Sequence, residues 1–281
     1  ERPYWDESVH YVFDMDEVLS IEASVEVLHS MCLEAVEQVV LTERYRDFGL
    51  PEWSWEHIEK SWRRSAPHVY GRFDLRYDGR RPPVLLEYNA DTPTTLLEAA
   101  ILQWHWKTDV FPADDQWNSL HEKLVARWAG IRDRLPGSEV HFTWSGAEAT
   151  GEDNVTVAYL QECAAEAGLH TVGLAIEDIG FDIDLNRFPH ELTEYVLKPK
   201  LGREGANITI VGAGYETETG GVYGEEGYVY QLLDPLPQFD DMRPALGAWI
   251  VGDESAGLGI RETSGLVTDN GAAFVPHRIP L

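Results

Sequence analysis

Two β-rich runs separated by a short polar turn constrain this chain more than any other feature. Residues 72–77 read RFDLRY, and residues 84–89 read VLLEYN. Asp78-Gly79 between them is typical of a tight hairpin turn. The sequence therefore predicts an antiparallel hairpin in this region.

The polar residues of this hairpin are expected to gather on one face. Side chains alternate between the two faces of a strand, so Arg72 and Asp74 share a face, as do Glu87 and Asn89. One register places Asp74 beside Glu87 and Arg72 beside Asn89. Such a patch suits Mg²⁺ with a phosphate next to it. A solvated charged face is the alternative, although a purely structural hairpin would tend to avoid Asp opposite Glu.

The composition places the chain among globular proteins. Its 281 residues suit one large domain or two closely joined ones, and 43% of them are hydrophobic. No apolar run reaches the roughly 18 residues that a transmembrane helix needs. The first residues lack the pattern of a signal peptide, and the absence of an initiator Met indicates that the true start is missing.

The charge balance is strongly acidic, with a formal net charge of −27. This charge argues against nucleic acid and anionic membrane surfaces as partners, because both need a basic footprint. Two interpretations stay open: acidity for solubility or salt tolerance, and attraction of a cationic substrate such as a polyamine. Cys32 and Cys163 are too few for a disulfide framework and lie in helical patterns, which favours buried thiols and a cytoplasmic location.

The first half of the chain reads as mainly helical. A long amphipathic helix is expected over residues 16–47, and a shorter one over residues 56–64. Thr95 to Glu98 has the spacing of a capping box that begins a third helix, running toward Lys107. The expected apolar stripe of the long helix consists of Leu19, Ala23, Val27, Met31, Ala35 and Val39.

The middle of the chain predicts a βαβ unit within residues 139–176. Its strands are expected over residues 139–143 and 171–175, with a helix over residues 154–167 between them. The unit implies a parallel pair of strands. It lacks GxGxxG, which argues against a dinucleotide site.

The last third reads as β-rich, and its polar residues have two interpretations each. Strands are expected at YVLKPKL, ITIV, GYVYQLL, ALGAWIVG, AGLGIRE and GLVT. Lys198 and Arg203 flank a Gly-containing loop without P-loop spacing, so the loop is either one that closes over phosphates or an ordinary turn. Arg261 in a small, apolar strand pairs either with an acidic neighbour or with a transferred phosphoryl group. Gln231 either borders an adenine pocket or is a half-buried polar strand residue.

Four motifs, in order along the chain, resemble those of one family. They are LLEYNADTPTTLLEAA, YVLKPKLGREGANI, YVYQLL with DPLP, and GIRE with GLVTDN and FVPHRI. The stretch from about residue 50 to the C-terminus resembles the synthetase domain of glutathionylspermidine synthase and its stand-alone relatives, within the ATP-grasp superfamily. The resemblance implies an α/β fold with a βαβ pre-ATP region and a β-rich nucleotide-binding part.

The resemblance also implies chemistry and site residues. Family members activate a carboxylate with Mg-ATP as an acyl phosphate, which an amine attacks to form an amide. The alternatives are a ligase for another peptide or amino acid, and a non-catalytic nucleotide-binding protein. The residues that match the family's motifs are Asp74, Glu87 and Asn89 for Mg²⁺, Arg72 and Arg261 for catalysis, Lys198, Arg203, Glu204, Gly205, Ala206, Asn207, Gln231 and Leu233 for ATP, and Asp91 and Thr92 on the substrate side.

Other expectations concern organisation and partners. A single ligase domain over residues 1–281 is expected to comprise a helical part at 1–135, the βαβ unit at 136–186 and the ATP-grasp part at 187–281, with a mobile loop at 202–207. The family has a lysine-containing segment that lacks a counterpart in this sequence, so several tens of residues are expected to be missing near Asn186. No segment of this sequence resembles the family's amidase domain. Glutathione and a polyamine are candidate substrates, and a homodimer stays open. Changing Glu87 to Gln or Asp74 to Asn is expected to abolish turnover and leave the fold intact.

Overall fold

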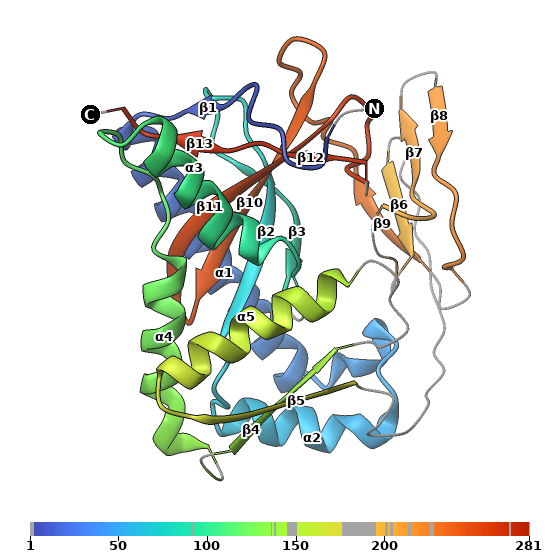
Figure 1. Ribbon diagram of the computed structural model, residues 1–281. Helices are drawn as coiled ribbons and strands as arrows, with labels where there is room; N and C mark the ends of the chain where they lie inside the picture. The colour runs from blue at the N-terminus through green and yellow to red at the C-terminus, as the bar shows by residue number, and fades with distance from the viewer. Residues whose placement is uncertain are drawn as a thin grey trace.

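An antiparallel five-stranded sheet forms the centre of the protein in a computed structural model (Figure 1). The structure describes residues 3–90, 93–135, 137, 139–144, 151–175, 195–199, 202, 205–212, 215–224, 228–269 and 271–280. The strands of the sheet follow the order β12, β11, β10, β2, β3. Their bounds are β2 Tyr70–Arg76, β3 Val84–Asn89, β10 Arg243–Val251, β11 Glu254–Thr263 and β12 Ala273–Phe274.

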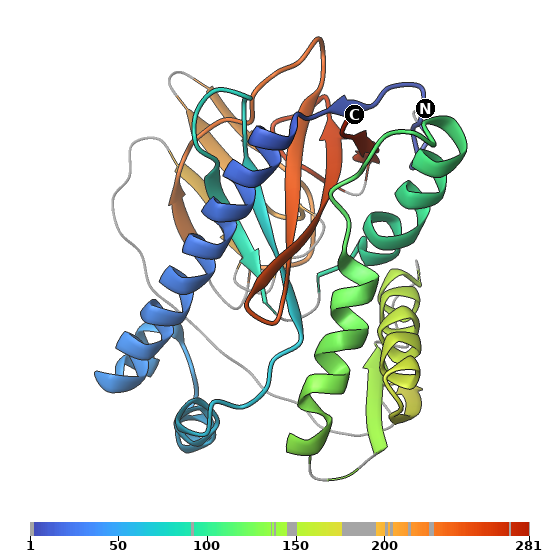
Figure 2. The same cartoon turned by 90° about the vertical axis from the view of Figure 1, so that its left-hand side faces the viewer.

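Helices cover both faces of this sheet, with α1 on one side and α3 and α4 on the other (Figure 2). Alternation along β10 shows the division, because Leu246, Ala248 and Ile250 pack on the α1 side, whereas Trp249 and Val251 pack on the α4 side. The helices of these layers are α1 Met15–Leu41, α2 Glu52–Arg63, α3 Gln103–Val110 and α4 Leu120–Ile131, with short 3₁₀ turns at Arg44–Phe48 and Arg132–Arg134 and a π turn at Glu98–Leu102.

The hairpin forms in the predicted register. Asp74 pairs with Glu87 and Arg72 pairs with Asn89, with an irregularity directly after Asp74. The turn contains Gly79 at φ +72°, the left-handed conformation in which glycine has no steric penalty. The local sequence therefore specified both the turn and the side chains that share a face.

The predicted βαβ unit is also confirmed. Strand β4 (Glu139–Trp144) pairs in parallel with β5 (His170–Ala175), and helix α5 (Glu152–Glu166) connects them. Gly168 at φ +86° follows the helix, as expected of a C-terminal stop. Leu160 and Cys163 of α5 pack into the same core as Trp128 of α4, so this unit rests against the helical layer of the central sheet.

A small four-stranded sheet stands beside the hairpin (Figure 1). Its order is β8, β7, β6, β9, with bounds β6 Tyr195–Pro199, β7 Thr209–Gly212, β8 Tyr215–Glu218 and β9 Tyr228–Leu232. The sequence predicted β6, β7 and β9 but not β8. The predicted strand at GLVT is wrong, because residues 265–268 lie in bends and irregular chain. Two short strands, β1 (Tyr11–Val12) and β13 (His277–Arg278), pair in parallel.

The helical predictions need three corrections. The first helix ends at Leu41, and its expected apolar stripe is largely exposed, because Val18, Ile21, Val25 and His29 face the core instead. The second helix begins earlier than predicted, directly after Pro51, and ends at Arg63. The third contains the π turn and runs to Val110.

The predicted capping box of the third helix is replaced by longer-range contacts. The Thr95 hydroxyl accepts a hydrogen bond from Arg72 at 3.3 Å, and the Glu98 carboxylate accepts one from the Tyr4 hydroxyl at 2.6 Å. Both side chains that the box needs are thereby directed to partners far away in the sequence.

Candidate active site

A bidentate ion pair between Arg72 and Asp74 lies at the centre of the candidate site. Arg72 Nε donates to Asp74 Oδ1 at 2.6 Å, and Arg72 Nη2 donates to Asp74 Oδ2 at 3.0 Å. Both residues are buried, with 4% and 5% of their surface exposed. Their position two residues apart on β2, with side chains on one face, makes this geometry possible.

Arg261 joins this pair from β11, two strands away. Its Nη2 donates to Asp74 Oδ2 at 2.8 Å, and its side chain is 22% exposed. The strand between them has glycine opposite Asp74, at Gly247. A Cβ at Gly247 would lie 2.9 Å from Arg72 Cδ, so the absence of a side chain there leaves the space that the guanidinium occupies.

Electrostatics keep Asp74 charged in this cluster. Burial alone would raise the pKa of the carboxyl group, but Arg72 and then Arg261 outweigh that effect and hold its pKa below the ordinary value of 3.8. The pKa of Arg261 is lowered, first by burial and then by repulsion from Arg72, while Asp74 and Glu87 oppose that shift. Two cations therefore share one buried anion. With Glu87 and its neighbour Lys198 included, three cations face two carboxylates, which leaves a net positive charge for an anionic ligand.

Two threonines accept further hydrogen bonds from Arg72. Its Nη1 donates to the Thr94 carbonyl oxygen at 2.7 Å and to the Thr95 hydroxyl. Thr95 has φ +66°, an unfavourable conformation for a β-branched residue, which is found mainly where the surroundings impose it. The sequence pattern predicted Thr95 as a helix cap and did not indicate its contact with Arg72. It also did not indicate that Gly247 belongs to the site. The only sequence signal was the turn-forming stretch Pro93-Thr94.

Glu87 and Asn89 extend the site toward solvent. Asn89 Nδ2 donates to Glu87 Oε1 at 2.9 Å, and the Glu87 side chain is 44% exposed. Lys198 of β6 places its Nζ 3.5 Å from Glu87 Oε2. The structure thus brings together the five residues Arg72, Asp74, Glu87, Asn89 and Lys198.

Gln231 provides a second connection between the small sheet and the hairpin. Its Nε2 donates to the Leu86 carbonyl oxygen at 2.8 Å, from strand β9 to strand β3. Leu233 follows β9 directly and is half-buried. Both residues therefore lie near the hairpin, and Gln231 is a partly buried strand residue whose amide binds backbone.

The loop between β6 and β7 contacts the chain that follows β11. A Cβ at Gly205 would lie 2.9 Å from Val267 Cγ1, and Gly205 has φ +70°. Asn207 Oδ1 accepts a hydrogen bond from the Tyr223 backbone N–H at 2.8 Å, and Ala206 lies between these two residues. The other predicted residues, Arg203, Glu204, Asp91 and Thr92, lie outside the described residues.

The cysteines do not supply a nucleophile. Cys163 is fully buried, and burial raises the pKa of its thiol to about 11. Cys32 is half-buried in α1, and burial likewise raises its pKa. Both thiols are protonated at neutral pH, whereas the thiolate is the reactive form.

The donor set of the hairpin fits a hard divalent cation. Asp74, Glu87 and Asn89 offer carboxylate and amide oxygens on one face, and such oxygens are the ligands of Mg²⁺. Asp74 can bind a cation only if it shares its oxygens with the arginines, because Arg72 and Arg261 already bind both of them. Glu87 and Asn89 are the more accessible donors of the three.

The α/β fold, with a small four-stranded sheet beside a cluster of arginines and carboxylates, is typical of an ATP-grasp-like protein, and the comparisons agree. A family model described as glutathionylspermidine synthase preATP-grasp matches residues 1–191 and 183–280. The chain belongs to the glutathionylspermidine synthase family.

Named relatives narrow the activity. The chain is 32% identical to a putative acid–amine ligase of Haemophilus influenzae, over 98% of this chain and 90% of that protein. It is 26% identical to a trypanothione synthetase of Crithidia fasciculata, over 90% of this chain but 54% of that protein. A glutathionylspermidine synthase of the same organism is 33% identical over 57% of this chain and 23% of its own length. The chain thus spans about half or less of these two longer relatives.

These relationships identify the chain as an ATP-dependent ligase that joins a small-molecule carboxylate to an amine through a carbon–nitrogen bond. In the described part of the chain, no helix has both the length and the apolar character that crossing a membrane requires.

Proposed function

We propose that this ligase works through an acyl phosphate, with Arg72 and Arg261 directed at the phosphoryl group that is transferred. The single observation that carries this proposal is the arrangement of two arginines on one buried carboxylate, next to the exposed acid Glu87. A buried anion that only balanced charge would need one arginine. The second one leaves positive charge where a phosphoryl group would gain negative charge.

Each side chain has a defined task in this mechanism. The guanidinium groups of Arg72 and Arg261 stabilise the oxygens of the phosphoryl group and then the oxyanion that forms when the amine attacks. Lys198 binds a nucleotide phosphate from the small sheet. Glu87, Asn89 and Asp74 would hold Mg²⁺, which neutralises phosphate charge when bound. Asp74 also orients both arginines, because it binds three of their nitrogen atoms.

A cavity beside the end of the hairpin is the proposed substrate side. It has a volume of about 470 Å³ and lies next to Ala90, which follows the hairpin directly. Aromatic and apolar side chains line it, among them Tyr70, Trp128 and Phe142, together with His68 and His141. Polar and apolar surface contribute about equally to the lining, and a cavity that combines apolar walls with polar groups can bind a small molecule.

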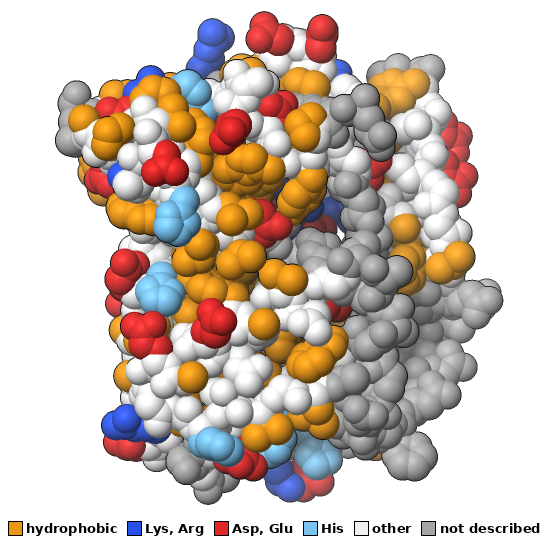
Figure 3. Space-filling model, viewed as in Figure 1, with side chains coloured by type: hydrophobic (Ala, Val, Ile, Leu, Met, Phe, Trp, Pro, Cys, Tyr) orange, Lys and Arg blue, Asp and Glu red, His pale blue; other side chains and the backbone are white. Residues whose placement is uncertain are grey.

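The amine is proposed to be a polyamine and the acid a peptide such as glutathione. The net charge of −27 supports a cationic substrate, because a negative surface raises the local concentration of cations. On the coloured part of the face shown in Figure 3, acidic side chains are spread widely and outnumber the basic ones, so the attraction is not confined to one spot. Two unpaired cysteines support the cytoplasm as the proposed location.

The test measures ADP release with panels of acids and amines in the presence of Mg²⁺. We expect release that needs both substrates, with glutathione and spermidine among the active pairs. If ADP is released with a peptide that lacks a thiol but not with glutathione, glutathione is the wrong acid substrate, whereas the proposed ligase activity stands. The absence of release with every pair would contradict the proposed mechanism.

A further inference from the structure

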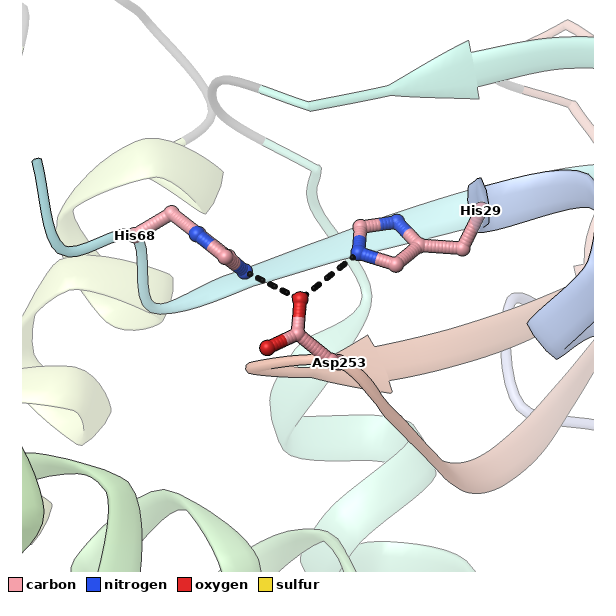
Figure 4. A group of neighbouring side chains, drawn as sticks. All are labelled: His29, His68 and Asp253. Atoms are coloured by element: carbon pink, nitrogen blue, oxygen red, sulfur yellow. Dashed lines mark hydrogen bonds and ion pairs between the residues drawn. The ribbon is translucent and has the colours of Figure 1, made fainter. Parts of the chain in front are cut away.

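A group of two histidines and one aspartate lies where three separate segments meet, and one of its members, His68, also lines the cavity proposed as the substrate side. His29 comes from α1, His68 from the segment before β2, and Asp253 from the turn between β10 and β11 (Figure 4). The two imidazole rings approach the carboxylate from opposite sides. Of all described residues, only this group brings three such ligand atoms within 4.8 Å of one another.

The distances within this group match those around a small metal ion. His29 Nε2 lies 3.2 Å and His68 Nε2 lies 3.3 Å from the same oxygen, Asp253 Oδ1. Zinc binds nitrogen and oxygen at about 2.0–2.2 Å, so two ligands at tetrahedral positions are about 3.3 Å apart. The ring centroids of the two histidines are 5.9 Å apart, which leaves room for an ion between the nitrogens after a small movement of the carboxylate.

The surrounding structure holds the ligands in place. His29 is 4% exposed and contacts the rings of Phe73 and Tyr88 edge-on. The backbone on either side of His68 is fixed, because its carbonyl oxygen accepts from Arg127 Nε at 2.7 Å and the next carbonyl accepts from the Gly252 N–H at 2.8 Å. Fixed ligands lose little entropy when they bind a metal ion.

Metal binding requires that both ligand nitrogens be free of protons. His68 Nε2 lies 3.0 Å from the Gly252 carbonyl oxygen, which can only accept, so this nitrogen carries a proton and must release it, and leave that carbonyl, when the metal ion binds. In His29 the proton can stay on the ring. Binding through Nε2 requires that this nitrogen carry no proton, so a neutral imidazole keeps its proton on Nδ1. His29 Nδ1 lies 3.3 Å from the Tyr88 hydroxyl oxygen, which can accept that N–H. The phenol oxygen bears the lone pairs that an acceptor needs. A histidine ligand whose other ring nitrogen donates to a neighbour is the usual arrangement in metal sites.

We propose that His29, His68 and Asp253 bind a divalent transition metal ion, with Zn²⁺ the best match to two imidazoles and one carboxylate. The side chains of His68 and Asp253 are 44% and 65% exposed, so the ion enters from solvent and water completes its coordination. The ion would join α1, the start of β2 and the β10–β11 turn. Its role is therefore structural, and metal binding does not require the proposed ligase mechanism, although His68 also lines the proposed substrate cavity.

The test measures Zn²⁺ binding by calorimetry with chelator-treated protein that has no histidine tag. Excess Mg²⁺ in the buffer occupies sites made of oxygen ligands alone, such as the hairpin. We expect one zinc ion to bind and to raise the melting temperature, because it stabilises only the folded state. His68→Gln and Asp253→Asn change exposed side chains, so both variants are expected to fold and to bind zinc at least about ten-fold more weakly.

His105→Gln is the matched control, because His105 is an exposed histidine of α3 outside the group. It should bind zinc as the parent does. The proposal is wrong if the parent takes up no zinc, or if His68→Gln and Asp253→Asn keep the parent's affinity and the same gain in melting temperature. A crystal of the zinc complex should show an anomalous peak between the three side chains, and a peak elsewhere would also overturn the proposal.

Discussion

Asp74 has two tasks at the residue scale, because it binds both Arg72 and Arg261. Both of its oxygens accept hydrogen bonds from guanidinium groups, and it is buried. Removing its charge would leave two cations in a buried position without their partner. This corrects the expectation that Asp74→Asn leaves the fold intact, since a buried pair that loses one member is strongly destabilised.

Asp74→Asn and Glu87→Gln should therefore behave differently. We expect Asp74→Asn to lower the free energy of unfolding by about 3–5 kcal/mol and to abolish turnover. Glu87→Gln is its matched control, because that side chain is 44% exposed, and its free energy of unfolding should change little while turnover is lost. Urea unfolding and ADP release measure both effects. Equal stability of the two variants would contradict the assignment of Asp74 as the partner of both arginines.

The same carboxylate makes stability depend on pH. Burial raises the pKa of Asp74, but Arg72 and Arg261 lower it by more than burial raises it. The pKa in the folded state therefore lies below the ordinary value of 3.8. A lowered pKa adds stability that is present above the ordinary value and is lost as the pH falls through the folded-state value. The difference in unfolding free energy between the parent and Asp74→Asn should keep its full size from about pH 7 to about pH 5 and shrink as the pH falls below about 4. A difference that stays constant or grows below about pH 4 would be inconsistent with this sign.

The residues of the hairpin could be placed from the sequence, whereas their partners could not. Alternation along a strand and the Asp78-Gly79 turn fix which side chains share a face, and the observed register agrees. The contact from Arg261 to Asp74 spans 187 residues and depends on the order of strands in the sheet. Thr95 and Gly247 belong to the site for the same reason, because only the folded sheet brings them to Arg72.

At the scale of elements, the small sheet reaches the hairpin through two polar contacts. Lys198 of β6 lies near Glu87, and Gln231 of β9 donates to the backbone of β3. Positions in neighbouring antiparallel strands thus contact the same edge of the central sheet. If ATP binds between these two sheets, Lys198 should contribute to nucleotide affinity more than to the chemical step.

Lys198→Met tests this arrangement. We expect the KM for ATP to rise by roughly ten-fold or more, as for the loss of one hydrogen bond to a charged group, with a smaller change in kcat. The matched control is Lys60→Met, which removes an exposed ion pair with Glu56 on α2. Steady-state kinetics at varied ATP concentration measure the effect. An unchanged KM for ATP would remove Lys198 from the nucleotide site.

The first helix shows where periodicity alone fails. The expected stripe used steps of four residues, and each such step turns about 40° further than one full rotation, so the stripe winds off the core face. The buried positions Val18, Ile21, Val25 and His29 mix steps of three and four, which keeps them on one side. The βαβ unit was predictable because its strands and its helix differ in period and Gly168 marks the end of the helix.

At the scale of the whole molecule, the acidity is the property that no single residue explains. The formal net charge of −27 comes from 49 acidic and 22 basic residues. A field of this sign attracts cationic substrates and repels ATP, so local cations must hold the nucleotide. In the proposed site, the arginine pair and Lys198 would supply them. The net charge follows from the sequence, but the distribution of charges over the surface needed the fold.

The charge predicts a salt dependence that differs between the two substrates. The kcat/KM for a polyamine should fall as the salt concentration rises from about 0.05 M to about 0.5 M, because screening removes the long-range attraction. The kcat/KM for an anionic peptide should stay constant or rise over the same range. Kinetics with spermidine and glutathione as varied substrates check this pair of trends. A polyamine value that is insensitive to salt would leave solubility as the role of the acidity.

The central claim is that the arginines around Asp74 act on the transferred phosphoryl group, and the most direct test is ADP release by Arg261→Ala. The fold should survive, because Asp74 keeps its bidentate pair with Arg72. We expect kcat to fall by about two to three orders of magnitude, as for the loss of one donor to a developing anion. Arg243→Ala changes a half-buried arginine that donates to the Ser264 carbonyl and to Gln238, and it should keep the parent's kcat. An Arg261→Ala variant that folds and turns over as fast as the parent would contradict the account.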